Sequence, residues 1–390
     1  MAEKLVLSYP GLIFLCFLFL TVGASSLEPT VSEEPIVQEK QDSFKIKFDR
    51  FNKKAEKFFT YVPAPIVSSS PETGYVYGLA KLNIIELYPA DTGTTPTNIH
   101  GLVSFSSLGH TNFYAGTQVY LRADSYFMQG GIGYRYFPEY IQGIGNQPFL
   151  RDVESFVLRQ VYTNNVFYKG LYQNNFLGFV CNVNNVLGIT LPKDSYLDIE
   201  NITGKDGGLS VGFGLSYLYD KRDNRYNSSS GHYFNLEMTF HQHWFGSDFN
   251  YNHYVIDLRE YRLIYRHQVL AFQLYTEANL GDVPFFSLAK LGGSNRMRGY
   301  YEGAIRDKII LDSQVEYRVP IWNIFGMTAW VGTGRVAESY ESLEAADFWF
   351  SYGFGLRFMI DSKNKTNLRL EFGFGEEGYQ ALNVNFSEAF

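Results

Sequence analysis

From residue 74 to its end, the chain alternates between apolar and polar side chains. The clearest segment, 348–360, carries seven large apolar residues on one face and mostly Gly, Ser and Arg on the other. Segments 211–219 and 368–375 repeat this pattern. Period-two alternation is typical of a β-strand, and roughly 9–11 tilted residues suffice to span a bilayer. An apolar outer face opposite a polar inner face predicts the strands of a membrane barrel.

Fifteen segments of this kind can be delimited: 74–88, 97–107, 112–123, 125–137, 153–168, 171–187, 207–221, 231–244, 251–265, 267–280, 308–320, 325–336, 347–360, 366–376 and 381–390. Single-chain bacterial barrels have even strand counts, which returns both ends to the periplasm. We therefore predict an all-β, transmembrane, antiparallel up-and-down β-barrel of 16 strands, with one strand missed or merged within 153–206. Because periplasmic turns are short, the long connections at 188–206 and 281–303 are expected to be extracellular.

The residues before the barrel divide into four segments. Residues 1–24 have the basic start, apolar core and small-residue cleavage site of a secretory signal peptide. Residues 25–43 are polar and acidic, which predicts a flexible mature N-terminus. Residues 44–60 repeat Phe at helical spacing among Lys and Arg, which predicts a short basic amphipathic helix, with a disordered tether as the alternative. Residues 61–73 are a predicted linker to the barrel domain, 74–390.

Composition favours the same class of protein. Aromatic residues make up 17% of the chain and charged residues only 19%, which suits a lipid-facing band with aromatic girdles better than a soluble core. A net charge of −7 disfavours nucleic-acid binding. The sequence shows neither a phosphate-binding glycine loop nor paired metal-ligand spacing. We therefore expect no cofactor, no metal and no enzymatic activity, and we expect outer-membrane lipid as a partner.

The most informative stretch is a doubly basic, glycine-rich connection at 291–306. It holds the adjacent pair Gly292 and Gly293 and, at its centre, Arg298, Gly299 and Tyr300. Three further motifs accompany this connection: Asp220-Lys-Arg-Asp-Asn224 with Gly231 after it, Val315-Glu-Tyr-Arg-Val-Pro320, and Gly353-Phe-Gly-Leu-Arg357.

Together these motifs resemble those of the BamA/TamA-type outer-membrane assembly barrels, the bacterial surface-antigen family, over residues 72–390. The resemblance implies that the connection folds into the barrel and that Arg298 meets an acidic residue of the inner wall, Glu316. Arg318 and Trp330 are the other expected lumen partners. A guanidinium is suited to a bidentate bond with a carboxylate. A role limited to filling the barrel is the alternative, and the two roles do not exclude each other.

The end of the chain and two departures from the family pattern complete this comparison. Segment 381–390 alternates and ends on an aromatic residue, so Phe386 and Phe390 are expected to form the closing-strand assembly signal. Gly332 stands where the family has an aspartate, which predicts a thinner acidic cluster. Fewer than 50 residues separate the signal from the first predicted strand, so a member without periplasmic POTRA repeats is expected.

The resemblance implies a location in the outer membrane of a Gram-negative bacterium. The expected function is to assist outer-membrane protein insertion or export together with separate periplasmic partners. The working element would be the seam between the first strand, 74–88, and the last, 381–390, with periplasmic or outer-membrane assembly factors and client proteins as partners. The alternative is a passive porin-like or structural barrel.

Overall fold

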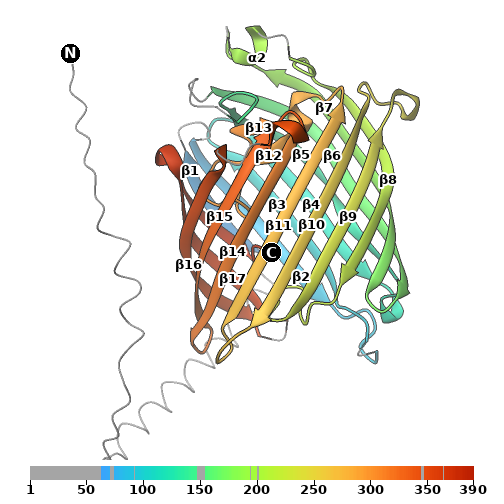
Figure 1. Ribbon diagram of the computed structural model, residues 1–390, viewed down its shortest axis with the longest axis vertical. Coiled ribbons are helices and arrows are strands. Elements are labelled where there is room, and N and C mark those ends of the chain that lie inside the picture. Colours follow the sequence, from blue (N-terminus) through green and yellow to red (C-terminus); the bar gives the residue numbers. More distant parts are fainter. Residues whose placement is uncertain are drawn as a thin grey trace, which may run out of the picture. The chain divides into compact units, whose positions relative to one another are not determined.

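In the part of the chain that the computed structural model describes, sixteen antiparallel strands form one sheet (Figure 1). The structure describes residues 63–70, 74–91, 93–146, 154–193, 195–199, 202–343, 347–362 and 364–390. The predicted signal peptide 1–24, the N-terminal segment 25–43 and the amphipathic helix 44–60 lie outside the described residues. Among the described residues, no helix is long and apolar enough to cross a membrane.

The strands of the large sheet follow their order in the sequence. They are β1 (Ala64–Ser70), β2 (Gly74–Ile85), β3 (Thr97–Ser106), β4 (Thr111–Tyr120), β5 (Tyr126–Ile141), β6 (Glu154–Tyr172), β7 (Asn175–Thr190), β8 (Gly208–Asp220), β9 (Gly231–His241), β10 (Tyr251–Leu263), β11 (Val269–Gly281), β14 (Ile309–Trp322), β15 (Phe325–Ala337), β16 (Trp349–Asp361), β17 (Thr366–Gly375) and β18 (Gln380–Phe386). A two-stranded sheet, β12 (Ala289–Leu291) with β13 (Ile305–Asp307), interrupts the β11–β14 connection. The short helices are α2 (Tyr196–Ile199), η1 (Arg122–Asp124), η3 (His243–Phe245), η4 (Phe285–Ser287), η5 (Tyr340–Ser342) and η7 (Glu376–Gly378).

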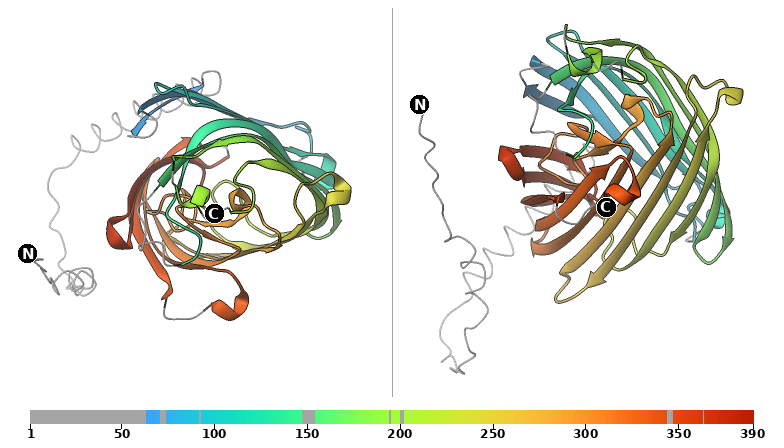
Figure 2. Two further views of the ribbon diagram at one scale, coloured as in Figure 1. Left: turned by 90° about the horizontal axis from the view of Figure 1, so that it is seen from above. Right: turned by 45° about the horizontal axis from the view of Figure 1, so that its top comes forward.

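The sheet curves round a lumen that contains parts of the chain itself. Seen from above, the β12–β13 region lies inside the ring of strands, and the marked C-terminal end also falls within the ring (Figure 2). Buried side chains from the loop after β12 and from both small strands form one apolar cluster with strands β14 and β15. The barrel is therefore partly filled by the connection that the sequence singled out.

The alternation predicted from the sequence is confirmed on β16. Phe350, Tyr352, Phe354 and Leu356 are exposed on the outer face, whereas Ser351, Gly353, Gly355 and Arg357 are buried on the inner face. The outward side chains form the surface that meets lipid, because successive strand residues point to opposite faces. Both predicted long connections, now 191–207 and 282–308, leave the barrel at the same end, because four strands, β8 to β11, separate them.

The sixteenth strand was assigned to the wrong place. All fifteen delimited segments are strands, but the missing one is β1, inside the predicted linker 61–73, and not within 153–206. It pairs in register with β2, from Ala64 opposite Ala80 to Ser70 opposite Gly74. Pro65 and three serines remove the alternation that identified the other strands. Proline is tolerated because β1 is an edge strand, where one row of N–H groups has no ladder partner.

The closing strand is also shorter than predicted. β18 ends at Phe386, not at residue 390, and Ser387 has a positive φ of 63°. The chain then turns inward, and Phe390 is buried against Tyr261 and Ala271 instead of extending the alternating strand. Phe390 therefore does not continue the strand pattern expected of a closing-strand signal. The alternating pattern predicted the start of β18 to within one residue, but it did not predict the turn that ends this strand.

The two-faced strands lead to a direct test at Phe354, in the middle of β16. Replacing Phe354 with Arg should destabilise the barrel by about 2–4 kcal/mol, since this is the usual penalty for Arg on the lipid face near the bilayer midplane. Urea unfolding in lipid vesicles, followed by the heat-sensitive gel shift of folded barrels, measures the change. Phe354→Leu is the matched control and should stay within about 1.5 kcal/mol of the unaltered chain. Equal stability of the Arg and Leu variants would contradict a lipid-facing position.

Candidate functional site: the inward loop and its arginine cluster

Residues 292–304, called the inward loop here, can fold into the lumen because its glycines occupy backbone conformations that other residues avoid. Gly292, Gly293, Gly299 and Gly303 have φ values of 98°, 113°, 135° and 81°. A Cβ atom on Gly299 would lie 2.7 Å from the backbone carbon of Phe374. The loop therefore needs glycine both for its turns and for its close approach to the barrel wall.

Arg298 lies at the centre of the loop and is fully buried, at 0% exposed. Its Nη1 atom is 2.6 Å from Glu316 Oε2 and donates a hydrogen bond of 3.0 Å to Glu371 Oε1. Its Nη2 atom donates to Gln314 Oε1 at 3.2 Å. The guanidinium carbon also stacks 3.8 Å from the ring centre of Trp330. Strands β14, β15 and β17 thus hold one charged group from three sides.

Tyr300 fixes the second point of the loop. Its hydroxyl donates to the carbonyl of Phe350 at 2.8 Å and accepts from the backbone N–H of Glu376 at 2.8 Å. Its ring packs near Trp349 and Tyr379, with ring centres 6.3 and 5.0 Å away. These contacts join the loop to β16 and to the β17–β18 turn. Arg298 and Tyr300 therefore anchor the loop at two separate places on the barrel wall.

The inner face of β17 is shaped to receive the loop. A Cβ atom on Gly373 would lie 2.4 Å from the carbonyl oxygen of Arg298, and one on Gly375 would lie 2.6 Å from the ring of Tyr300. Gly334 on β15 makes similar room for the Met297 side chain, at 3.2 Å. From the sequence, such glycines were expected to belong to a polar inner face. Here they serve close packing instead.

The two acidic wall residues also bind arginines of the barrel. Glu316 Oε1 accepts from Arg318 Nε at 2.7 Å and from Arg357 Nη2 at 3.4 Å. Glu371 Oε2 accepts from Arg369 Nη1 at 2.6 Å. Four guanidiniums therefore surround two carboxylates, all of them buried. We call Arg298, Arg318, Arg357, Arg369, Glu316 and Glu371 the arginine cluster.

The structure brings together most of the residues predicted for this site. Arg298 and Glu316 are in contact, Trp330 lies against the guanidinium, and Arg318 binds Glu316. The expected bidentate pair is absent from these contacts, because one nitrogen of Arg298 serves both carboxylates. Glu371 was not selected from the sequence, although its place on the polar face of 368–375 was visible. Glu371 supplies a second carboxylate to the acidic cluster, which was expected to have fewer acidic residues because Gly332 replaces an aspartate of the family pattern.

The Asp220–Asn224 motif forms the β8–β9 turn. Asp220 accepts two hydrogen bonds from the Arg222 guanidinium, at 2.8 and 2.9 Å, and Asn224 Oδ1 accepts from the backbone N–H of Tyr226. Burial alone would raise the pKa of Asp223, but hydrogen bonds from Ser229 and Ser230 hold that pKa below its ordinary value. The motif therefore fixes the shape of a turn.

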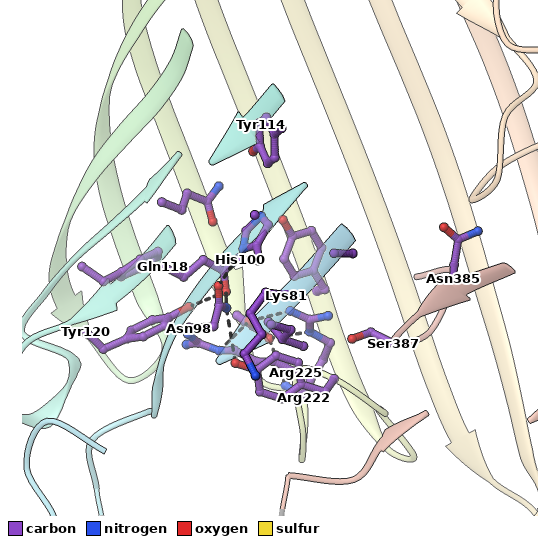
Figure 3. Close-up of a pocket in the computed structure, with 18 of the residues that line it drawn as sticks. Lys81, Asn98, His100, Tyr114, Gln118, Tyr120, Arg222, Arg225, Asn385 and Ser387 are labelled. Atoms are coloured by element: carbon purple, nitrogen blue, oxygen red, sulfur yellow. Dashed lines mark hydrogen bonds and ion pairs between the residues drawn. The ribbon is translucent and has the colours of Figure 1, made fainter. Parts of the chain in front are cut away.

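A cavity of about 610 Å³ lies in the lumen beside this turn (Figure 3). Lys81, His100 and Tyr114 line it from the early strands, and Arg222 and Arg225 from the β8–β9 turn. Asn385 and Ser387 lie across the cavity from these groups (Figure 3). Each of the two turn arginines is paired with Asp220. Arg225 also lies 3.7 Å from Asp124 Oδ2, so the two guanidiniums face two carboxylates of the wall.

The Omp85 superfamily domain matches residues 160–390 of this sequence, which include the inward loop, the arginine cluster and the β8–β9 turn. The chain belongs to the Omp85 superfamily. It is an outer-membrane β-barrel protein of a Gram-negative bacterium, as the sequence resemblance predicted. Barrels of this superfamily act in assembly or transport and are not enzymes. No curated protein sequence matches the chain.

Two solved structures show the same fold at low sequence identity. BamA from Haemophilus ducreyi lacking POTRA domains 1–3 is 12% identical, with a TM-score of 0.50, over 89% of this chain and 78% of that one. CdiB from Escherichia coli is 10% identical, with a TM-score of 0.50, over 85% of this chain and 67% of that one. At these identities, the likeness describes the barrel architecture of this Omp85 protein.

The burial of Arg298 predicts a large effect of its removal. Arg298→Ala should release the inward loop and cost about 3–5 kcal/mol, since it leaves two buried carboxylates short of a partner. Arg298→Lys should recover only part of this, because one ammonium cannot reproduce the planar fork. Urea unfolding and protease cleavage within 292–304 measure the two effects. Arg262→Ala, at an exposed ion pair, is the control and should cost about 0–1 kcal/mol. A Lys variant identical to the unaltered chain would contradict this account.

A second test concerns the glycine wall. Gly373→Ala should destabilise the docked loop by about 1–3 kcal/mol, because the added methyl group overlaps the Arg298 carbonyl. Faster cleavage of the loop by an added protease, in barrels that still show the folded gel shift, is the expected result. Gly188→Ala on β7 is a matched control, since a Cβ there meets nothing within 4 Å. Equal cleavage of both variants would rule out close packing as the reason for glycine at position 373.

Proposed function

We propose that this Omp85 protein assists the insertion or export of outer-membrane proteins, together with separate periplasmic partners. The working element is the seam between the two edge strands of the sheet. Its partners are outer-membrane lipid, client proteins and assembly factors of the periplasm or outer membrane. Membership of a superfamily of assembly and transport barrels supports this proposal.

One observation carries the proposal. The strand order ends in β1 and β18, and no pairing between these two strands is found in the described part of the chain. Each edge strand is seven residues long. An unpaired edge presents a row of N–H and C=O groups that an extended peptide can pair with as an added strand. The sequence placed the first edge at 74–88; the structure moves it to β1.

A passive porin-like or structural barrel is the second candidate, and the lumen cavity favours it. The cavity of about 610 Å³ is lined in part by polar and charged groups, as a solute path requires. Two segments, however, occupy part of the lumen: the inward loop packs against β14 and β15, and Phe390 packs against β10 and β11. Passive flux would therefore require these segments to move out of the lumen.

The seam can be tested by bridging it. In a Cys181→Ser background, cysteines at Val67 and Asn383, in the middle of β1 and β18, are joined with a short bis-maleimide linker. Bridging should abolish insertion of a client barrel into lipid vesicles that contain this protein, because a covalent bridge across the seam blocks the entry of a client strand between the two edges. The two single-cysteine variants treated with the same reagent are the controls and should retain insertion. Insertion that survives bridging, or solute flux with no insertion, would favour the passive barrel.

A further inference from the structure

The last residues of the sequence, Ser387–Phe390, are called the inner tail here, and they bind inside the barrel. The turn at Ser387 directs them away from β18 and into the lumen. The Ser387 N–H donates to the Asn367 carbonyl at 2.8 Å, and Arg369 Nε donates to the Ser387 carbonyl at 2.5 Å. The first residue of the tail is therefore held by β17 and by a member of the arginine cluster.

Glu388 adds the third carboxylate to the arginine cluster. It forms an ion pair with Arg357, lies 3.9 Å from Arg318 Nε and accepts a hydrogen bond of 2.6 Å from Asn367 Nδ2. The cluster on its own has four guanidiniums and two carboxylates. Because buried charge is costly when it is not compensated, Glu388 brings the inner tail to a place where a negative charge is needed.

Phe390 anchors the far end of the tail. Its carbonyl oxygen accepts from Arg318 Nη2 at 2.9 Å, and its ring packs with Tyr261 and Ala271 of strands β10 and β11. The backbone N–H of Glu388 donates to the Tyr226 carbonyl at 3.3 Å, in the β8–β9 turn. The tail thus joins β18 to strands β10 and β11 and to the β8–β9 turn.

We propose that the inner tail is an intramolecular latch that holds the edge strand β18 in place and limits opening of the seam. Arg318 and Arg357 bind both Glu388 and Glu316, and Glu316 binds Arg298. The tail and the inward loop therefore share the same anchors. When the tail leaves them, β18 keeps only its seven-residue pairing with β17.

The space for this movement is present. The lumen cavity borders Asn385 and Ser387, at the point where the tail departs from β18 (Figure 3). The cavity gives a released tail open space beside β18. That the latch regulates the seam rests on the function proposed above. The contacts that form the latch do not depend on that function.

The test measures hydrogen–deuterium exchange of β18 in the full chain, in lipid and without any client. Glu388→Gln should raise the exchange rate of residues 380–386 about tenfold or more, the factor that corresponds to a loss of about 1.4 kcal/mol. Glu377→Gln, at an exposed position in the β17–β18 turn, is the matched control and should leave the rate unchanged. If the Glu388→Gln barrel does not show the folded gel shift, the same exchange measurement is made on Phe390→Ala, for which the same increase is expected.

A reversible lock completes the test. In the Glu388→Gln, Cys181→Ser background, cysteines at Asn367 and Ser387 should form a disulfide that returns β18 exchange to its original rate, and reductant should release it. Unchanged exchange in the Glu388→Gln and Phe390→Ala barrels, or a formed disulfide without effect, would overturn the latch. Client insertion is measured separately: faster exchange without any insertion supports the latch and counts against the proposed function alone.

Discussion

The structure depends on the burial of arginine charge inside a membrane barrel. Arg298, Arg318, Arg357 and Arg369 lie where water does not reach, so each requires carboxylates or carbonyl groups as partners. These partners come from strands, from the inward loop and from the inner tail. If the inward loop or the inner tail leaves the lumen, a buried charge loses a partner. The contacts of the lumen therefore depend on one another.

Close packing gives this electrostatic unit its geometry. The guanidinium of Arg298 reaches Glu371 only because the loop backbone lies directly on β17, where Gly373 and Gly375 leave the space. The same glycines give β17 a flat inner face. At these two positions β17 has no inner side chain of its own to pack. The loop therefore replaces packing that the strand lacks, and strand and loop stabilise each other.

Of the two edge strands of the sheet, β18 is followed by the inner tail, which binds inside the lumen. β1 and β18 are both short edges, which leaves hydrogen-bonding groups available for another strand. An edge of this kind is also a liability, because it invites unwanted pairing. A tail that ties β18 to the buried arginine cluster keeps the edge in a defined position. The same charges that dock the loop thus act on the seam.

The sequence by itself determined the membrane barrel, fifteen of its sixteen strands and the residues of the inward loop. These follow from period-two alternation and from a glycine-rich basic motif, both of which are local properties of the chain. It also indicated Glu316, Arg318 and Trp330 through a family resemblance.

Only the tertiary structure decided the rest. β1 is a strand because β2 offers it a partner, not because Pro65 and its serine neighbours favour one. Glu371 became a partner of Arg298 because β17 lies beside the loop, and the alternation of that strand does not specify which loop residue it meets. Phe390 turned inward because Arg318 and Tyr261, more than 70 and 120 residues earlier in the sequence, form its site. Such choices depend on contacts between distant segments, which a local pattern does not encode.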